Sequence, residues 1–165
     1  MKNTYNSNLK LQQPDNARSA VVNLILDHLV DALGSDPGCT MRRAIILTDI
    51  DENPGSTQSE ILGRMDVHKS ALNRDIEWLY DHGCIMRQPA PEDARILRLR
   101  TCGYAKKNLD FALKHFDYSH KNLKTFLEGF VGMFGAHKPT LRDAKIVSFL
   151  GHKKSVTRQE IFDNL

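Results

Sequence analysis

The sequence of 165 residues contains no run of about eighteen apolar residues, the length that a membrane-spanning helix needs. Residues 1–16 are polar, rich in Asn and Gln, and lack the apolar middle region of a secretory signal. We therefore expect a cytoplasmic protein with no membrane segment. Residues 1–16 are expected to form a disordered polar arm.

Cysteine is scarce, with only Cys39, Cys84 and Cys102. An odd number of thiols, at spacings unlike those of paired metal ligands, argues against a disulfide framework. His115 and His120 are five positions apart and do not share one helix face, which argues against zinc. We expect reduced thiols, no metal and no cofactor, with a redox-sensing thiol as the alternative hypothesis.

Catalytic motifs are also missing. The sequence has no nucleophile elbow, no glycine-rich phosphate loop and no pair of carboxylates at a spacing that would support acid–base chemistry. The sequence therefore favours a binding protein over an enzyme.

Charge is nearly balanced, since 23 Lys and Arg face 20 Asp and Glu and give a formal net charge of +3. An excess this small does not by itself indicate a nucleic-acid partner. Its distribution is more informative, because the cations are in excess over residues 57–107 and 138–165 while residues 1–56 are net acidic.

Apolar residues at helical spacing predict a first helix over Ala17–Leu33 and a second over Thr40–Ile50. Thr57-Gln58-Ser59-Glu60 has the form of a capping box and predicts a short helix over Gln58–Met65. After a turn, a helix is expected over His68–Asp81, with Leu72, Ile76 and Leu79 on its buried face. These two elements have the spacing of a helix-turn-helix.

Two strands, Cys84–Gln88 and Ile96–Arg100, are expected next, because Leu97 and Leu99 alternate with polar or outward positions. A charged loop joins them into a hairpin. Apolar residues at helical spacing then continue over Tyr104–Phe116 and on to Gly135, which predicts two long helices or one bent helix. The order of elements predicts a winged helix-turn-helix in a mostly α fold with a small β wing.

This arrangement resembles the MarR family of bacterial regulators, through the residues from Thr57 to Leu62 and from Lys69 to Ile76, with Leu79, Gly83 and Ile85. The resemblance covers about residues 17–135. It departs from the family at Arg100, where a Thr is usual, and at His68, where a Ser commonly caps the recognition helix.

The resemblance implies a homodimer that binds double-stranded DNA, with long helices on both sides of the winged domain pairing between copies. It also implies a transcription regulator that reads its operator with the recognition helix in the major groove and the wing in the minor groove. An effector ligand is left open. The winged domain with its flanking dimerisation helices is expected over residues 17–137.

The outward face of the predicted recognition helix is the first candidate site, because its first turns would reach base edges. Its residues are His68, Lys69, Ser70, Asn73 and Arg74. In the wing, Arg95 beside Asp93 is expected to be held by that carboxylate and to enter the minor groove, as the resemblance implies. Arg87 and Arg98 are expected to contact phosphates. Arg42 and Arg43 are a further phosphate-contact candidate.

Residues 140–165 align without gaps on residues 40–65, and the capping box recurs as Thr157-Arg158-Gln159-Glu160. The identical positions are Thr140, Arg142, Ala144, Ile146, Thr157, Glu160 and Ile161, against Thr40, Arg42, Ala44, Ile46, Thr57, Glu60 and Ile61. We therefore expect residues 138–165 to form a basic helical segment that partly repeats residues 40–65, although chance similarity of amphipathic helices is an alternative.

Two other functions fit the same pattern. One is a replication or plasmid-maintenance protein with tandem winged helices, and the other is a winged-helix module that binds a partner protein. The salt dependence of DNA binding separates the DNA-binding functions, the regulator and the replication protein, from the protein-interaction module, since counterion release accompanies only binding to phosphates.

Overall fold

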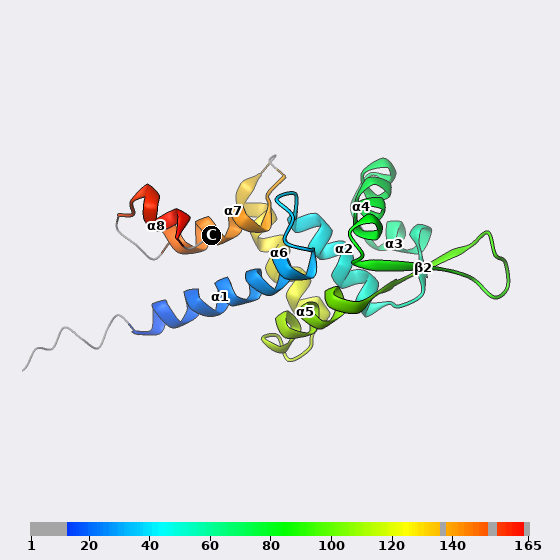
Figure 1. Ribbon diagram of the computed structural model, residues 1–165, viewed down its shortest axis with the longest axis horizontal. Coiled ribbons are helices and arrows are strands. Elements are labelled where there is room, and N and C mark those ends of the chain that lie inside the picture. The colour runs from blue at the N-terminus through cyan, green and yellow to red at the C-terminus, as the bar shows by residue number, and fades with distance from the viewer. Residues whose placement is uncertain (1–12, 136–137, 152–154, 164–165) are drawn as a thin grey trace, which may run out of the picture.

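The computed structural model describes residues 13–135, 138–151 and 155–163 and has the predicted mostly α fold with a small antiparallel sheet (Figure 1). Its elements in chain order are α1 (Gln13–Ala32), α2 (Met41–Glu52), β1 (Ser56–Thr57), α3 (Gln58–Arg64), α4 (Lys69–Asp81), β2 (Ile85–Pro89), β3 (Leu97–Thr101), α5 (Gly103–Lys114), α6 (His120–Phe134), α7 (Leu141–Leu150) and α8 (Arg158–Phe162). The predicted arm falls mostly outside the described residues, and α1 begins four positions before its expected start.

Hydroxyl side chains start five of these helices, because each accepts a backbone N–H that the first turn leaves without a helical partner. The N-cap residues are Thr40, Thr57, Ser119, Thr140 and Thr157. The predicted capping boxes at Thr57 and Thr157 are confirmed, with Glu60 and Glu160 returning a carboxylate to the cap N–H. A third box joins Thr140 and Asp143.

The sheet has three strands in the order β1–β3–β2. The predicted hairpin is confirmed with each strand shifted by one residue, since β2 pairs with β3 from Ile85↔Thr101 to Pro89↔Leu97. Strand β1 was not predicted. It pairs Ser56 with Leu99, and Gly55 at φ 89° allows its N–H to donate to the Leu99 carbonyl at 2.8 Å.

Two helices follow the wing, rather than one bent helix. Helix α5 ends at Lys114, and Asp117 and Tyr118 take positive φ values of 51° and 60° before α6 begins. Helix α5 packs along α1, whereas α6 turns back and packs along α2. The apolar stripes that the sequence assigned to a dimer partner are thus covered in large part within the chain.

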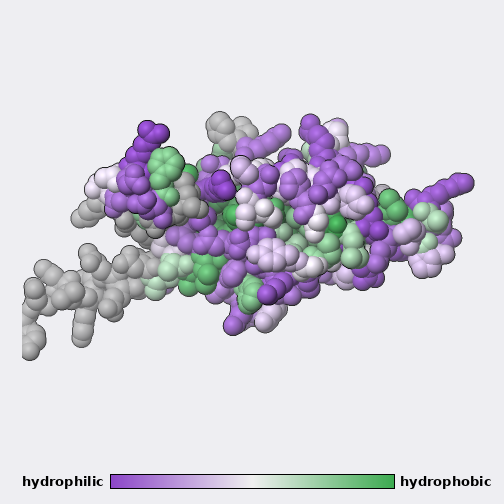
Figure 2. All heavy atoms as spheres, in the orientation of Figure 1, coloured by the Kyte–Doolittle hydropathy of each residue, from purple (hydrophilic) through white to green (hydrophobic). Residues whose placement is uncertain are grey.

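The core is continuous from α1 through α2 to α4, α5 and α7. Helix α7 lies along α1, and among the described residues some apolar side chains stay exposed on the outer face of α1, including Val21 and Leu24. Hydrophobic side chains along α1 are visible in the view of Figure 2. Within the described part of the chain, no helix is both long enough and apolar enough to cross a bilayer.

Candidate nucleic-acid interface

The helix-turn-helix consists of α3 and α4. Leu72, Ile76 and Leu79 are buried as predicted and anchor α4 on the core. The opposite face is exposed, and this face carries all five candidates, His68, Lys69, Ser70, Asn73 and Arg74. Among the described residues, no carboxylate forms an ion pair with Lys69 or Arg74. The exposed face therefore offers cations and hydrogen-bonding groups to an outside partner.

His68 caps the start of α4 despite being an unusual choice for this position. Its Nδ1 lies 3.4 Å from the Ser70 backbone N–H, which donates to it, and 2.9 Å from the Ser70 hydroxyl. The imidazole thus satisfies one free N–H of the first turn, as Ser or Asp would do. The departure from the family pattern at His68 leaves the helix start intact.

Gln58 at the start of α3 contacts the exposed face of α4. Its side-chain amide donates a hydrogen bond to Oδ1 of Asn73. Because this bond fixes which side of the Asn73 amide faces α3, it orients a group that would otherwise rotate freely at the surface. The sequence pattern had not indicated Gln58.

The most consequential residue that the sequence did not reveal is Asp75, whose side chain is 4% exposed in the middle of α4. Its carboxylate accepts hydrogen bonds from Nε of Arg42 at 2.5 Å and from Nε of Arg43 at 3.2 Å. Arg42 and Arg43, considered from the sequence as phosphate contacts, here fasten α4 to α2. Arg43 also lies 4.1 Å over the ring of Trp78.

Two arginines of the wing strands, Arg87 and Arg98, have carboxylate partners. Nη2 of Arg87 lies 2.6 Å from Glu77 of α4, and its guanidinium stacks 4.4 Å over Tyr80. Arg98 pairs with Glu92 and donates to the Gly55 carbonyl at 3.1 Å. Hydrogen bonds from Arg87 and Arg98 lower the pKa of Glu77 and of Glu92 respectively. To bind Arg87 or Arg98, a DNA phosphate would therefore have to displace the carboxylate of Glu77 or Glu92.

Asp93 and Arg95 form a different contact from the expected one. The Asp93 carboxylate accepts the backbone N–H of Arg95 at 2.9 Å, which stabilises the turn at the wing tip. This contact does not involve the guanidinium, and the Arg95 residue is exposed. The wing tip is therefore shaped by Asp93, and the direction of the Arg95 side chain is not set by that carboxylate.

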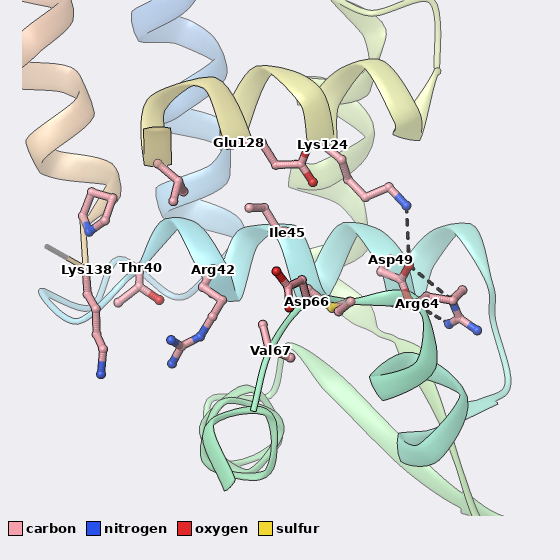
Figure 3. Close-up of a pocket in the computed structure, with 13 residues that line it drawn as sticks. Thr40, Arg42, Ile45, Asp49, Arg64, Asp66, Val67, Lys124, Glu128 and Lys138 are labelled. Carbon is pink, nitrogen blue, oxygen red and sulfur yellow. Dashed lines mark hydrogen bonds and ion pairs between the residues drawn. The ribbon is translucent and has the colours of Figure 1, made fainter. Parts of the chain in front are cut away.

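A cavity of about 390 Å³ lies between α2, α6 and the turn that precedes α4 (Figure 3). Asp49 lies in its wall, with Arg64 at 2.7 Å and Lys124 at 3.5 Å. Asp66 and Val67 line it from the turn before α4. The charge of Asp49 is thus already balanced within the protein, and the cavity adjoins the helix-turn-helix without opening onto the exposed face of α4.

The thiols do not form a reactive centre. Burial raises the pKa of Cys39 to about 11 and that of Cys84 to about 12, and it also raises the pKa of Cys102. A thiol with a raised pKa holds little of the nucleophilic thiolate at neutral pH. The geometry therefore favours inert cysteines over redox sensing.

Residues 39–97 match the sequence model of the MarR family. The match begins before α2 and ends at the first residue of β3, so it spans the helix-turn-helix and the wing loop. No curated protein matches the sequence.

The chain is also similar to several solved structures. Streptococcus pneumoniae FabT in complex with DNA is 15% identical, with 73% of this chain and 91% of that chain covered and a TM-score of 0.47. A mutant MarR from E. coli complexed with operator DNA is 22% identical, with 62% and 73% covered and a TM-score of 0.44. A MarR protein from Peptoclostridium difficile is 18% identical, with 99% and 97% covered and a TM-score of 0.45.

Proposed function

We propose that this chain is a sequence-specific DNA-binding transcription regulator without enzymatic activity. The observation that carries the proposal is the exposed face of α4, which presents Lys69, Asn73 and Arg74 while the opposite face is anchored in the core. A protruding helix of this kind fits the major groove of B-DNA. The match of residues 39–97 to a family described as MarR supports the same function.

Asn73 and Arg74 are the residues that read base edges in this proposal. Asn suits adenine and Arg suits guanine, and each good bidentate contact contributes about 1–3 kcal/mol of discrimination. Asn73→Ala and Arg74→Ala should each weaken binding to a selected operator by about that amount, with a smaller effect on random duplex. Asn122→Ala and Lys107→Ala, at exposed positions of α6 and α5, are the matched controls.

The measurement is the binding of each folded variant to operator and to random DNA at several salt concentrations. If Asn73→Ala and Arg74→Ala both bind the operator like the parent, α4 is not the reading head. The chain would then be a protein-interaction module. A flat dependence of log affinity on log salt would lead to the same conclusion, because phosphate contacts release counterions.

The wing contributes contacts of another kind. Arg98→Ala should weaken operator and random DNA alike and make the salt slope shallower by about one unit, because it removes a phosphate contact. Arg95→Ala should reduce the preference for a narrow A·T-rich flank, because an inserted guanidinium responds to groove width. His68, Ser70 and Arg87 complete the proposed contact set.

We also propose a homodimer, the state that best matches two-fold operators. The exposed apolar side chains that support it are Val21 and Leu24 on α1 and Phe111 on α5. This surface is smaller than the sequence suggested, because α7 covers part of α1. Light scattering at micromolar concentration tests the proposal, and a monomer would refute it.

A tandem winged-helix protein of replication or plasmid maintenance is the second candidate, and one specific observation favours it. Thr40 and Thr140, equivalent positions in the two copies of the sequence repeat, pair with each other in an isolated antiparallel bridge. A contact between equivalent residues is what a chain with two related units would form.

A further inference from the structure

The bridge at Thr40 and Thr140 joins the starts of α2 and α7 symmetrically. The Met41 N–H donates to the Pro139 carbonyl at 3.0 Å, and the Leu141 N–H donates to the Cys39 carbonyl at 2.9 Å. If each residue near Thr40 is exchanged with the residue that aligns with it near Thr140, each of these hydrogen bonds becomes the other. An antiparallel pair of equivalent residues has local two-fold symmetry, so the two segments are related by a two-fold axis through the bridge.

The environments on the two sides of this axis also match. Met41 and Leu141 are each fully buried at the first position of their helices. Ala44 and Ala144, one turn later, are fully buried as well. The resemblance between the two sequence segments therefore reflects equivalent packing, which a chance likeness of amphipathic helices would not require.

The preceding helices extend the repeat. The apolar positions of α1 recur in α6 at an offset of 101, one more than the offset in α2 and α7, so the connecting loop is one residue shorter. The pairs are Val22 with Leu123, Ile25 with Phe126, Leu26 with Leu127, Leu29 with Phe130, and Val30 with Val131. Helix α1 packs along α7, and α6 packs along α2. In each copy of the repeat the first helix, α1 or α6, thus packs on the second helix of the other copy, α7 or α2 respectively.

Helix α8 is the counterpart of α3. Both begin at a capping-box Thr, Thr57 for α3 and Thr157 for α8. In Figure 1, α8 lies at the opposite end of the long axis from α3 and along the same upper edge of the molecule as α4. Helix α8 is thus displaced along the long axis of the molecule from α3 and α4.

Two arginines lie on this second unit, Arg142 half-buried and Arg158 exposed. The guanidinium of Arg142 on α7 donates a long hydrogen bond of 3.5 Å to the Ser35 carbonyl. Arg158 on α8 is exposed and lies 5.6 Å over the ring of Phe162. Guanidinium groups bind phosphate oxygens through charge-assisted hydrogen bonds.

We propose that α7 and α8 form a second DNA-contact surface, which binds the phosphate backbone of the same duplex beside the site read by α4. The inference rests on the proposed function of α4. Phosphates that flank the bases read by α4 are the groups such a surface would bind.

The first experiment tests whether the pairing is within one chain. Thr40→Cys with Thr140→Cys, in a Cys39→Ala background, places two thiols at a non-hydrogen-bonded antiparallel pair, where Cβ atoms lie close enough to cross-link. Mild oxidation should give a cross-linked monomer on a non-reducing gel, with the 40–140 link found by peptide mapping. A covalent dimer, or folded protein that does not cross-link, would overturn the intrachain pairing.

The second experiment tests the DNA contact without altering the bridge. Arg142→Ala with Arg158→Ala should make the salt slope shallower by roughly 1.8, at about 0.9 per lost phosphate, and shorten the hydroxyl-radical footprint at one end. Base preference should not change. Lys107→Ala with Lys121→Ala, a loss of equal charge at exposed positions of α5 and α6, is the control.

The outcomes separate this inference from the proposed function. If Asn73→Ala weakens operator binding while the Arg142 and Arg158 double variant keeps the parent's slope and footprint, only the second contact surface is refuted. If Asn73→Ala and Arg74→Ala have no effect, the proposed function of α4 is refuted first.

Discussion

Asp75→Asn is the substitution that should damage DNA binding most without touching the DNA. The carboxylate of Asp75 accepts from Arg42 at 2.5 Å and from Arg43 at 3.2 Å, and both arginines lie in the first turn of α2. Together these bonds fix the rotation of α4 about its axis. Leu72 and Ile76 are apolar contacts without directional preference, whereas the buried Asp75 carboxylate holds α4 on α2 through directed hydrogen bonds.

The magnitude follows from burial. Removing one partner of a fully buried ion pair costs about 3–5 kcal/mol. The side chains of Arg42 and Arg43 are 29% and 17% exposed, so water can solvate part of the freed charge. The amide that replaces the carboxylate would also still accept one hydrogen bond. We therefore expect a loss of about 2 kcal/mol in the free energy of unfolding, which lowers Tm by roughly 4–8 °C for a chain of this size.

Urea denaturation with an unchanged m-value measures the loss, and operator binding measures its effect on α4. Asp81→Asn, an exposed position at the end of the same helix, should stay within about 0.5 kcal/mol of the parent. If Asp75→Asn is as stable as Asp81→Asn and binds the operator equally well, Asp75 does not fix the rotation of α4 about its axis.

Two further predictions concern buried groups. Burial alone would raise the pKa of Asp51, but hydrogen bonds from His120, Thr101 and Lys106 outweigh it and hold the pKa below its ordinary value. The stability that the charged Asp51 contributes should therefore be present at neutral pH and be lost as the pH falls below about 4. Acid unfolding of Asp51→Asn should be less steep than that of the parent, and equal acid profiles would refute the role. In the native protein at neutral pH, Ellman's reagent should label Cys102, the least buried thiol, slowly. The other two thiols should stay unmodified until urea is added, and rapid labelling of all three would contradict the burial described.

Sequence patterns predicted the elements of the winged helix because local rules govern them. The capping box at Thr57 and the spacing of Leu72, Ile76 and Leu79 depend on residues within two turns of a helix. Strand β1 was missed because its two residues are defined only by pairing with Leu99. The break after α5 was left open, since nothing in the composition of Asp117 and Tyr118 demands a positive φ.

The candidate site was only partly predictable for a related reason. An exposed helix face follows from the position of the buried one, so the exposed face of α4 could be named in advance. Asp75 could not, because a carboxylate is buried only when partners from distant sequence compensate it, and Arg42 lies in another helix. The sequence offered Arg42 only as a phosphate-contact candidate and gave no sign of its pairing with Asp75. The contact of Asp93 with Arg95 was predicted at the wrong group, because Asp93 binds the Arg95 backbone instead of its side chain.

The bridge between Thr40 and Thr140 also bears on how the chain folds. It closes a loop that contains the whole helix-turn-helix and the wing, and contacts of such long sequence separation form late because loop-closure entropy opposes them. The first N–H of α2 finds its acceptor, the Pro139 carbonyl, only when the residues before α7 are in place. The amides of Met41 and Leu141 should therefore exchange with solvent through one shared opening, with equal protection, although they begin different helices.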